Sequence, residues 1–277
     1  MNAGVEISFF NALKIQADYF SEKREGIFLE RASLPLYIGV STKPYVNVGK
    51  MKNHGFDTSL EYNQRVGQVR LSGKANFTYA HNTIIDNDQP DWKYPYLNRR
   101  GQMLWQQYGL VAAGLFESQA DIDSWPTQTF GEVKPGDIKY IDINGDGKID
   151  TNDEKPIGWA AVPEIVYGFG LSAAWKGLDC SVFFQGAGHV TLQQSGSAIQ
   201  AFSARNMMES GVYEDIYYNH WSEDNPNPNA KYPRLSIGSN KNNFRNSTFW
   251  QKDMSYLRLK TVEIGYNFPS KWIDPIH

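Results

Sequence analysis

Apolar and polar residues alternate one by one along several stretches of this chain, and this period of two restricts the fold more than any other feature. Residues 68–81 show two alternating sets: Val69, Leu71, Ala75, Phe77 and Tyr79 against Arg70, Ser72, Lys74, Asn76 and Thr78. Successive side chains of a β-strand point to opposite faces, so this stretch predicts a strand with one apolar and one wet face. The same reasoning predicts seven strands: 12–20, 26–32, 55–64, 68–81, 165–176, 178–185 and 255–268.

The last of these strands changes its parity in the middle. Leu257 and Leu259 share one parity, whereas Val262 and Ile264 share the other. An extra residue in one strand of an antiparallel pair produces such a change. We therefore expect a β-bulge near Lys260.

The connections between the predicted strands are either very short or very long. The short ones are 22–25, 66–67 and 177, and the long ones are 33–54, 82–163 and 187–250. Outer-membrane barrels have short periplasmic turns and long extracellular loops. The sequence therefore predicts an all-β fold, an antiparallel up-and-down transmembrane β-barrel wall with long extracellular loops. Two sets of side chains are expected on opposite faces: Arg70, Lys74, Asn76, Glu61 and Asn63 toward the lumen, and Phe77, Tyr79, Leu60 and Phe56 toward lipid.

A soluble protein is the main alternative, because every half-buried antiparallel sheet shows the same alternation. On this interpretation the chain is a secreted β-sheet carbohydrate-binding module with a calcium-stabilised loop, and its apolar residues lie between two sheets. Seven strands is an odd number, however, whereas single-chain bacterial barrels close with an even number. The first residues, 1–6, also show neither the basic nor the apolar region of a signal peptide. We therefore expect a barrel of which this chain is only a part.

Charge and composition exclude several other classes. The chain has 27 Lys and Arg against 30 Asp and Glu, with a net charge of −3, which gives no electrostatic reason for a nucleic-acid partner. The single cysteine, Cys180, cannot form an internal disulfide. No apolar run reaches the roughly 18 residues of a transmembrane helix.

Residues 142–153 have the spacing of a calcium-binding loop. Oxygen-bearing side chains occupy loop positions 1, 3, 5 and 12, a glycine follows at position 6, and position 7 can offer its backbone carbonyl. The predicted ligands of a structural Ca²⁺ are Asp142, Asn144, Asp146, Lys148 and Asp153. The alternative is a pair of Asn-Gly and Asp-Gly turns that needs no metal.

Catalytic motifs are missing, so we do not expect an enzyme. The five histidines are scattered, and the sequence contains no HExxH, GxSxG or Walker motif. Tryptophans in the long connections offer planes that stack on sugars or on a partner protein, and packing inside the loops is the alternative. The candidates for substrate binding are Trp92, Trp125 and Trp221.

Several segments together resemble one family, the SusC/RagA-type TonB-linked outer-membrane transporters, in the C-terminal part of their barrel. The segments are NVGKMKNHGFD (47–57), GDIKYIDINGDGKID (136–150), PEIVYGFG (163–170), FFQG (183–186), NPNAKYPRL (227–235), YLRLK (256–260) and GYNFP (265–269). The resemblance implies about 7 strands of a 22-stranded barrel in the cell outer membrane.

The same resemblance implies a function and partners. Such proteins import glycans or peptides across the outer membrane of Bacteroidetes-type bacteria, with a SusD-like lipoprotein as a lid and with energy from TonB. TonB acts through an N-terminal part, and a plug domain fills the barrel; residues 1–277 are expected to contain neither, and to form a partial TonB-dependent receptor β-barrel domain. The expected partners are therefore the lid lipoprotein, TonB, the cargo and the lipid bilayer.

Overall fold

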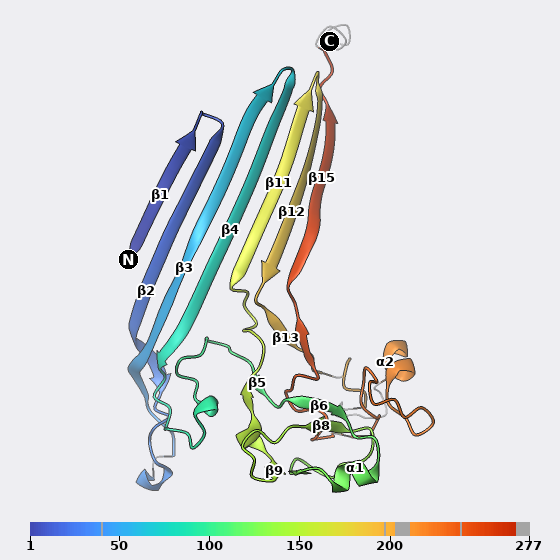
Figure 1. The fold of residues 1–277 in the computed structure, drawn as a ribbon. Coiled ribbons are helices and arrows are strands. Elements are labelled where there is room, and N and C mark those ends of the chain that lie inside the picture. Colours follow the sequence, from blue (N-terminus) through green and yellow to red (C-terminus); the bar gives the residue numbers. More distant parts are fainter. Residues whose placement is uncertain (40, 197, 203–210, 239, 270–277) are drawn as a thin grey trace.

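The computed structural model describes residues 1–39, 41–196, 198–202, 211–238 and 240–269. Its main element is an antiparallel seven-stranded sheet with the strand order β1-β2-β3-β4-β11-β12-β15 (Figure 1). The strands are β1 (Asn2–Phe9), β2 (Leu13–Glu30), β3 (Tyr45–Val66), β4 (Val69–Asp86), β11 (Ile165–Trp175), β12 (Leu178–Gly188) and β15 (Tyr256–Tyr266). Each strand pairs with the next long strand along the chain, which confirms the predicted up-and-down topology.

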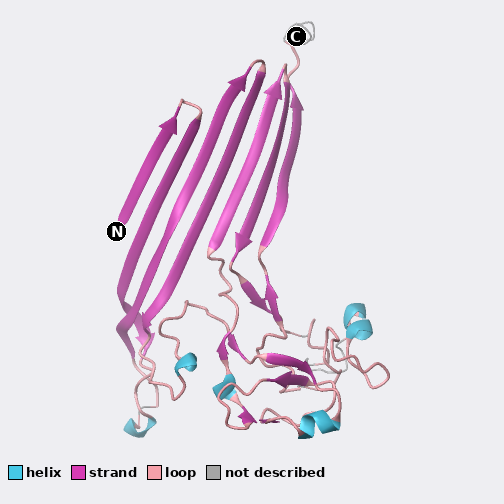
Figure 2. Ribbon diagram, in the orientation of Figure 1, coloured by secondary structure: helices cyan, strands magenta, loops and turns pink. Residues whose placement is uncertain are grey.

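Short turns join the strands at one end of the sheet, and all long connections gather at the other end (Figure 2). The connections contain small elements: η1 (Leu36–Ile38), η2 (Pro95–Leu97), β5 (Tyr108–Gly109), β6 (Ala112–Leu115), α1 (Gln119–Asp123), β7 (Thr127–Gln128), β8 (Ile138–Tyr140), β9 (Lys148–Ile149), η3 (Thr151–Asp153), β10 (Lys155–Pro156), β13 (Thr191–Gln193), α2 (Glu214–Asn219) and β14 (Gln251–Asp253). No helix in the described part of the chain is long and apolar enough to span a membrane.

The number of strands agrees with the prediction, but the predicted strands in the first thirty residues are wrong. The stretches 12–20 and 26–32 are one strand, β2, and no turn separates them at 22–25. The pairing with β3 shifts between Arg24 and Ile27, where Gly26 has a φ of 70°, so a β-bulge takes the place of the expected turn. The seventh strand, which the sequence did not predict, is β1, and it pairs with β2 from Asn2 to Phe9.

The first two long connections are also shorter than predicted. Strand β3 begins at Tyr45 and β4 continues to Asp86, so the connections are 31–44, 87–164 and 189–255. The bulge in β15 lies where it was expected: Phe183 pairs with Thr261 and Phe184 with Leu259, which leaves Lys260 unpaired.

The two faces of the sheet differ along its whole width. One cross-strand row consists of apolar residues in all seven strands: Ile7, Ile15, Leu60, Ala75, Phe169, Phe184 and Leu259. The adjacent row on the other face is polar apart from one glycine: Glu6, Gln16, Ser59, Asn76, Gly168, Gln185 and Arg258. The predicted lumen-facing and lipid-facing residues therefore do lie on opposite faces.

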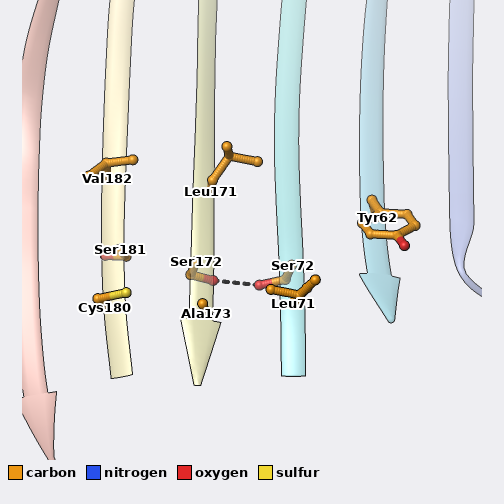
Figure 3. A pocket seen from close by; sticks show the side chains of 9 residues that line it. All are labelled: Tyr62, Leu71, Ser72, Leu171, Ser172, Ala173, Cys180, Ser181 and Val182. Atoms are coloured by element: carbon orange, nitrogen blue, oxygen red, sulfur yellow. Dashed lines mark hydrogen bonds between the residues drawn. The ribbon is translucent and has the colours of Figure 1, made fainter. Parts of the chain in front are cut away.

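The apolar face is exposed. Leu171 is 66% and Ile264 is 77% accessible, so no second sheet of the described residues covers these positions. The soluble alternative required a cover of that kind. A shallow hollow on this face is lined mainly by Tyr62, Leu71, Leu171 and Val182, and behind it the hydroxyls of Ser72 and Ser172 lie 2.5 Å apart (Figure 3).

Candidate functional site

The two longest connections fold together into a unit with its own hydrophobic core. Its buried residues come from both connections: Leu110, Leu115, Ile138, Tyr140, Ile149, Ala201, Ile216, Trp221, Tyr232 and Trp250. A backbone hydrogen bond also joins the two connections, in which the Leu110 nitrogen donates to the Asn246 carbonyl at 2.9 Å. A loop with a buried core holds a defined shape, so this unit presents a fixed surface beyond the end of the sheet.

A buried carboxylate, Asp137, is the polar centre of this unit. Its oxygens accept hydrogen bonds from Asn243 Nδ2 at 2.8 Å, Asn240 Nδ2 at 3.1 Å and Arg234 Nη2 at 3.0 Å, and also from the Lys134 backbone nitrogen at 2.8 Å. Asp137 is fully buried, and an unpaired charge there would be costly. The sequence shows Asp137 only as a neighbour of the predicted calcium loop, since its side-chain partners lie about a hundred residues away.

The Asp and Asn side chains of the predicted calcium ligands bond to backbone nitrogens of their own loop. Asp142 accepts from the nitrogens of Gly145 and Gly147 at 2.7 and 2.8 Å. Asp153 is fully buried and accepts from the Ile143 and Asp150 nitrogens, both at 2.8 Å.

The rest of this loop is bonded in the same way. The side chains of Asn144 and Asp146 accept from the nitrogens of Asp146 and Lys148 at 2.8 and 3.0 Å. Among the described residues there is no group of three or more His, Cys, Asp or Glu that could hold a metal ion. These hydrogen bonds suit a tight turn with or without an ion, so calcium binding stays a prediction.

The three candidate tryptophans differ in accessibility. Trp92 is 50% exposed and Trp221 only 5%, because Trp221 belongs to the core of the loop unit. Trp125 is half-buried, its Nε1 atom donates to the Tyr140 carbonyl at 2.7 Å, and the Lys139 Nζ atom lies 4.0 Å from its ring. Trp221 and Trp125 therefore pack within the loop unit, whereas Trp92 is accessible, and substrate binding by these residues stays a prediction.

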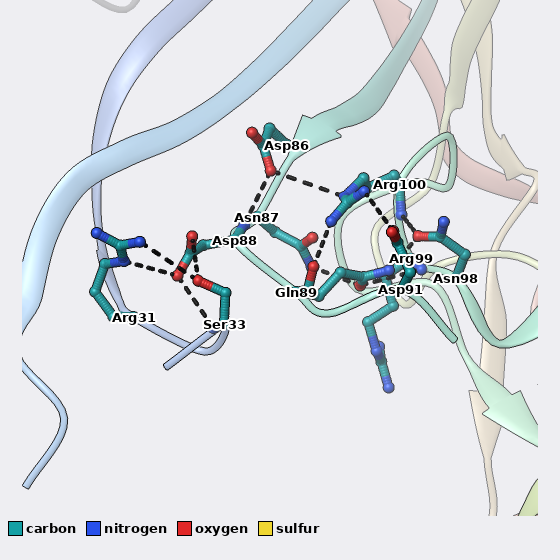
Figure 4. Close-up of polar contacts among 10 residues, drawn as sticks. All are labelled: Arg31, Ser33, Asp86, Asn87, Asp88, Gln89, Asp91, Asn98, Arg99 and Arg100. Carbon is teal, nitrogen blue, oxygen red and sulfur yellow. Dashed lines mark hydrogen bonds and ion pairs between the residues drawn. The ribbon is translucent and has the colours of Figure 1, made fainter. Parts of the chain in front are cut away.

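A polar network joins the first two long connections (Figure 4). Asp88 accepts from Arg31 Nε at 3.2 Å and from the Ser33 hydroxyl at 3.0 Å, whereas Arg100 contacts Asp91 at 3.2 Å and Asp86 at 3.8 Å. Burial alone would raise the pKa of Asp88, but the hydrogen bonds of Ser33 and the charge of Arg31 outweigh it and lower this pKa. Asp88 therefore stays ionised and ties residues 31–33 to the end of β4.

Two histidines that are far apart in the sequence meet at one carboxylate. Glu164 is 4% exposed, and its oxygens lie 2.5 Å from His81 Nδ1 and 3.0 Å from His189 Nδ1. The ring of His189 stacks on Trp159 with 3.9 Å between the centroids. This cluster lies where β4, β11 and β12 meet the long connections, and the scattered spacing of the histidines gave no signal for it.

A cavity of about 500 Å³ lies between the polar face of β2–β4 and the connection that follows β4. One cross-strand row, Glu22, Asn53 and Asn82, contributes polar groups to it, and Met103 and Leu104 contribute apolar surface. Asn82 Oδ1 accepts from the Leu104 nitrogen at 2.7 Å, and the Asn53 side chain has no hydrogen-bond partner in the described ranges. The cavity can therefore offer free amide groups to a ligand.

Comparisons of the sequence and of the structure find the same group of similar proteins. No family model matches the chain. TonB-dependent receptor P3 of Formosa agariphila is 27% identical over 292 residues, and this match covers 99% of the chain and 27% of the receptor. TonB-dependent receptor SusC of Bacteroides thetaiotaomicron is 21% identical over 98% of the chain, which corresponds to 26% of SusC.

Solved structures show the same architecture. The RagAB peptide transporter matches with a TM-score of 0.71 and 21% identity, over 98% of this chain and 28% of that one. The chain thus spans about 27% of the length of the curated relative P3. In its sequence and in its sheet the chain is thus similar to a barrel segment of the SusC/RagA-type TonB-dependent receptors.

Proposed function

We propose that this chain forms part of the wall and of the outer vestibule of an outer-membrane importer for glycans or peptides. The importer works with a SusD-like lipoprotein and is driven by TonB. The observation that carries the proposal is the two-faced sheet: the apolar row through Ile15 and Phe169 suits lipid, and the polar row through Gln16 and Asn76 suits a lumen. The family of the chain supports the same location, the outer membrane.

The loop unit and the inner cavity are the two surfaces that would contact the partner and the cargo. Because the loop unit has its own core, it presents a preformed surface to the lid lipoprotein and to the cargo. The cavity beside Asn53 and Asn82 lies on the polar face, where a passing ligand would meet it. One structural relative is a peptide importer, so peptides stand beside glycans as candidate cargo.

The chain supplies binding surfaces and no chemistry, because relatives along its whole length are receptors and transporters. This agrees with the prediction that it is not an enzyme.

Expression of the full-length parent receptor with its own leader tests the proposal. We expect a β-sheet protein in the outer-membrane fraction whose electrophoretic mobility changes on heating, and cells that need it to grow on one class of oligomer, glycan or peptide. A soluble, monomeric product would contradict the proposal and favour the secreted carbohydrate-binding module.

A pair of variants then tests the cavity. Asn53→Trp fills the inner cavity and is expected to slow uptake, whereas Thr83→Trp places the same ring on the opposite face and should not. Equal uptake by both variants, with normal heat-modifiable mobility, would remove the cavity from the import path and leave the barrel assignment intact.

A further inference from the structure

The apolar face of the sheet ends in an aromatic row on the side of the long connections. Tyr19 pairs with Phe56, Phe56 pairs with Tyr79, and the last two rings lie 5.8 Å apart. Tyrosines concentrate where a barrel leaves the hydrocarbon layer. This row therefore marks the level of the lipid head groups at the extracellular end.

Beyond the aromatic row, the same face becomes basic. Two residues beyond His54, Lys52 lies directly opposite Lys23 of β2, and Lys50 follows at the next position of the same parity. Like charges directly opposite one another in a sheet repel each other. An anion close to such a pair offsets this repulsion.

The protein itself supplies only part of this negative charge. The Lys23 Nζ atom lies 2.7 Å from Glu25 Oε1, and the same carboxylate attracts Lys50. Lys52 has no ion-pair partner among the residues that the structure describes. Three lysines against one carboxylate leave an excess of two positive charges.

The other acidic groups nearby are already engaged. Glu22 is on the opposite face and pairs with Arg24 at 3.1 Å. Asp86, which pairs with Lys50 across the strands, lies 3.8 Å from Arg100 Nε. Lys23, Lys50 and Lys52 share the parity of the apolar face, so the unbalanced positive charge lies on the membrane side of the sheet, and Lys52 also borders the inner cavity.

We propose that Lys23, Lys50 and Lys52 form a binding site for the phosphate groups of lipid head groups in the outer leaflet. The ammonium group of lysine binds phosphate as a compact point charge. A lysine just beyond the apolar band can extend along the strand and bring this charge to the head groups. The site depends on the outer-membrane location of the chain and not on the cargo that it transports.

The test uses the full-length receptor purified in detergent, with fluorescent lipid A that carries its phosphates as the probe. Lys50→Gln/Lys52→Gln is expected to weaken binding by roughly 25-fold at low ionic strength, because each lysine near an anionic surface contributes about a fivefold factor. Salt should weaken binding to the unchanged protein, since these lysines are exposed.

A matched variant, Lys14→Gln/Lys74→Gln, removes the same charge from the polar face, where these lysines pair with Glu6 and Glu61. It should bind lipid A as the unchanged protein does, and heat-modifiable mobility shows that each variant is folded. Equal losses in the two double variants would overturn the proposal, as would equally tight binding of dephosphorylated lipid A. Displacement of the lipid by equimolar inorganic phosphate would show a site for free anions instead.

Discussion

Trp221 packs on the backbone of Gly136 so closely that a Cβ atom at position 136 would lie 2.1 Å from the indole Cε3 atom. Gly136 also has a φ of 85°, a conformation that side chains other than glycine rarely adopt. Position 136 therefore requires glycine for two independent reasons. Gly136 also connects the buried carboxylate of Asp137 to the core of the loop unit.

Gly136→Ala is expected to loosen the loop unit while the sheet stays folded. The left-handed backbone costs about 1–2 kcal/mol, and the clash with Trp221 adds about 1–3 kcal/mol. Gly145→Ala is the control, because Gly145 has a φ of 73° but open space around it. Limited proteolysis of the receptor in membranes compares the two, and equal cleavage rates would contradict the role of the clash.

Asp88 is expected to hold the first long connection in a pH-dependent way. Its pKa is lower in the folded chain than the ordinary 3.8, so the stabilisation is complete above pH 3.8 and is lost as the pH falls through the folded value. Asp88→Asn should therefore cost about 1 kcal/mol at pH 7 and abolish the acid sensitivity. Protease cleavage within 31–44, followed from pH 7 to pH 3, measures both effects.

Asp91→Asn serves as the control for Asp88, since the Asp91 side chain is 93% exposed and forms an ion pair with Arg100 at the edge of the same network. Its cleavage profile should match that of the unchanged chain. An identical acid response in Asp88→Asn would show that other groups tie the two connections together.

The alternation of residues predicts the sheet well, because each strand has one apolar and one polar face and its pattern is local. Even the bulge at Lys260 follows from a change of parity between Leu259 and Val262. The pattern at Ala3, Val5, Ile7 and Phe9 was equally present and would have revealed β1. The charged run from Glu22 to Glu25 was predicted as a short connection, yet it continues strand β2 beyond the aromatic row.

The loop unit could not be predicted in the same way. Its contacts join residues that are distant in the sequence, such as Asp137 with Asn243 and Glu164 with both His81 and His189. Composition does not separate a tryptophan that packs, such as Trp221, from one that is exposed, such as Trp92. Spacing likewise does not decide whether a carboxylate in a tight turn binds an ion or the backbone.

Asp153→Ala is expected to destabilise the 142–153 turn whether or not calcium is present. The side chain accepts backbone hydrogen bonds from Ile143 and Asp150 while fully buried, and leaving these donors unpaired costs about 2–4 kcal/mol. Thermal unfolding of the receptor with calcium and with a chelator measures this loss. If calcium raises the melting temperature and Asp142→Ala removes that increase, the ion site predicted from the sequence is established.

Leu171→Arg should reduce folding into the membrane far more than Asn76→Arg. Leu171 is 66% exposed on the apolar face near the middle of β11, and arginine at the bilayer midplane costs about 2–4 kcal/mol. Asn76 lies on the polar face of the neighbouring strand, where arginine meets water. The folded fraction is read from heat-modifiable mobility in the outer-membrane fraction. Equal yields of the two variants would mean that the apolar face does not meet lipid, because a position in contact with lipid tolerates a charge less well than one in contact with water.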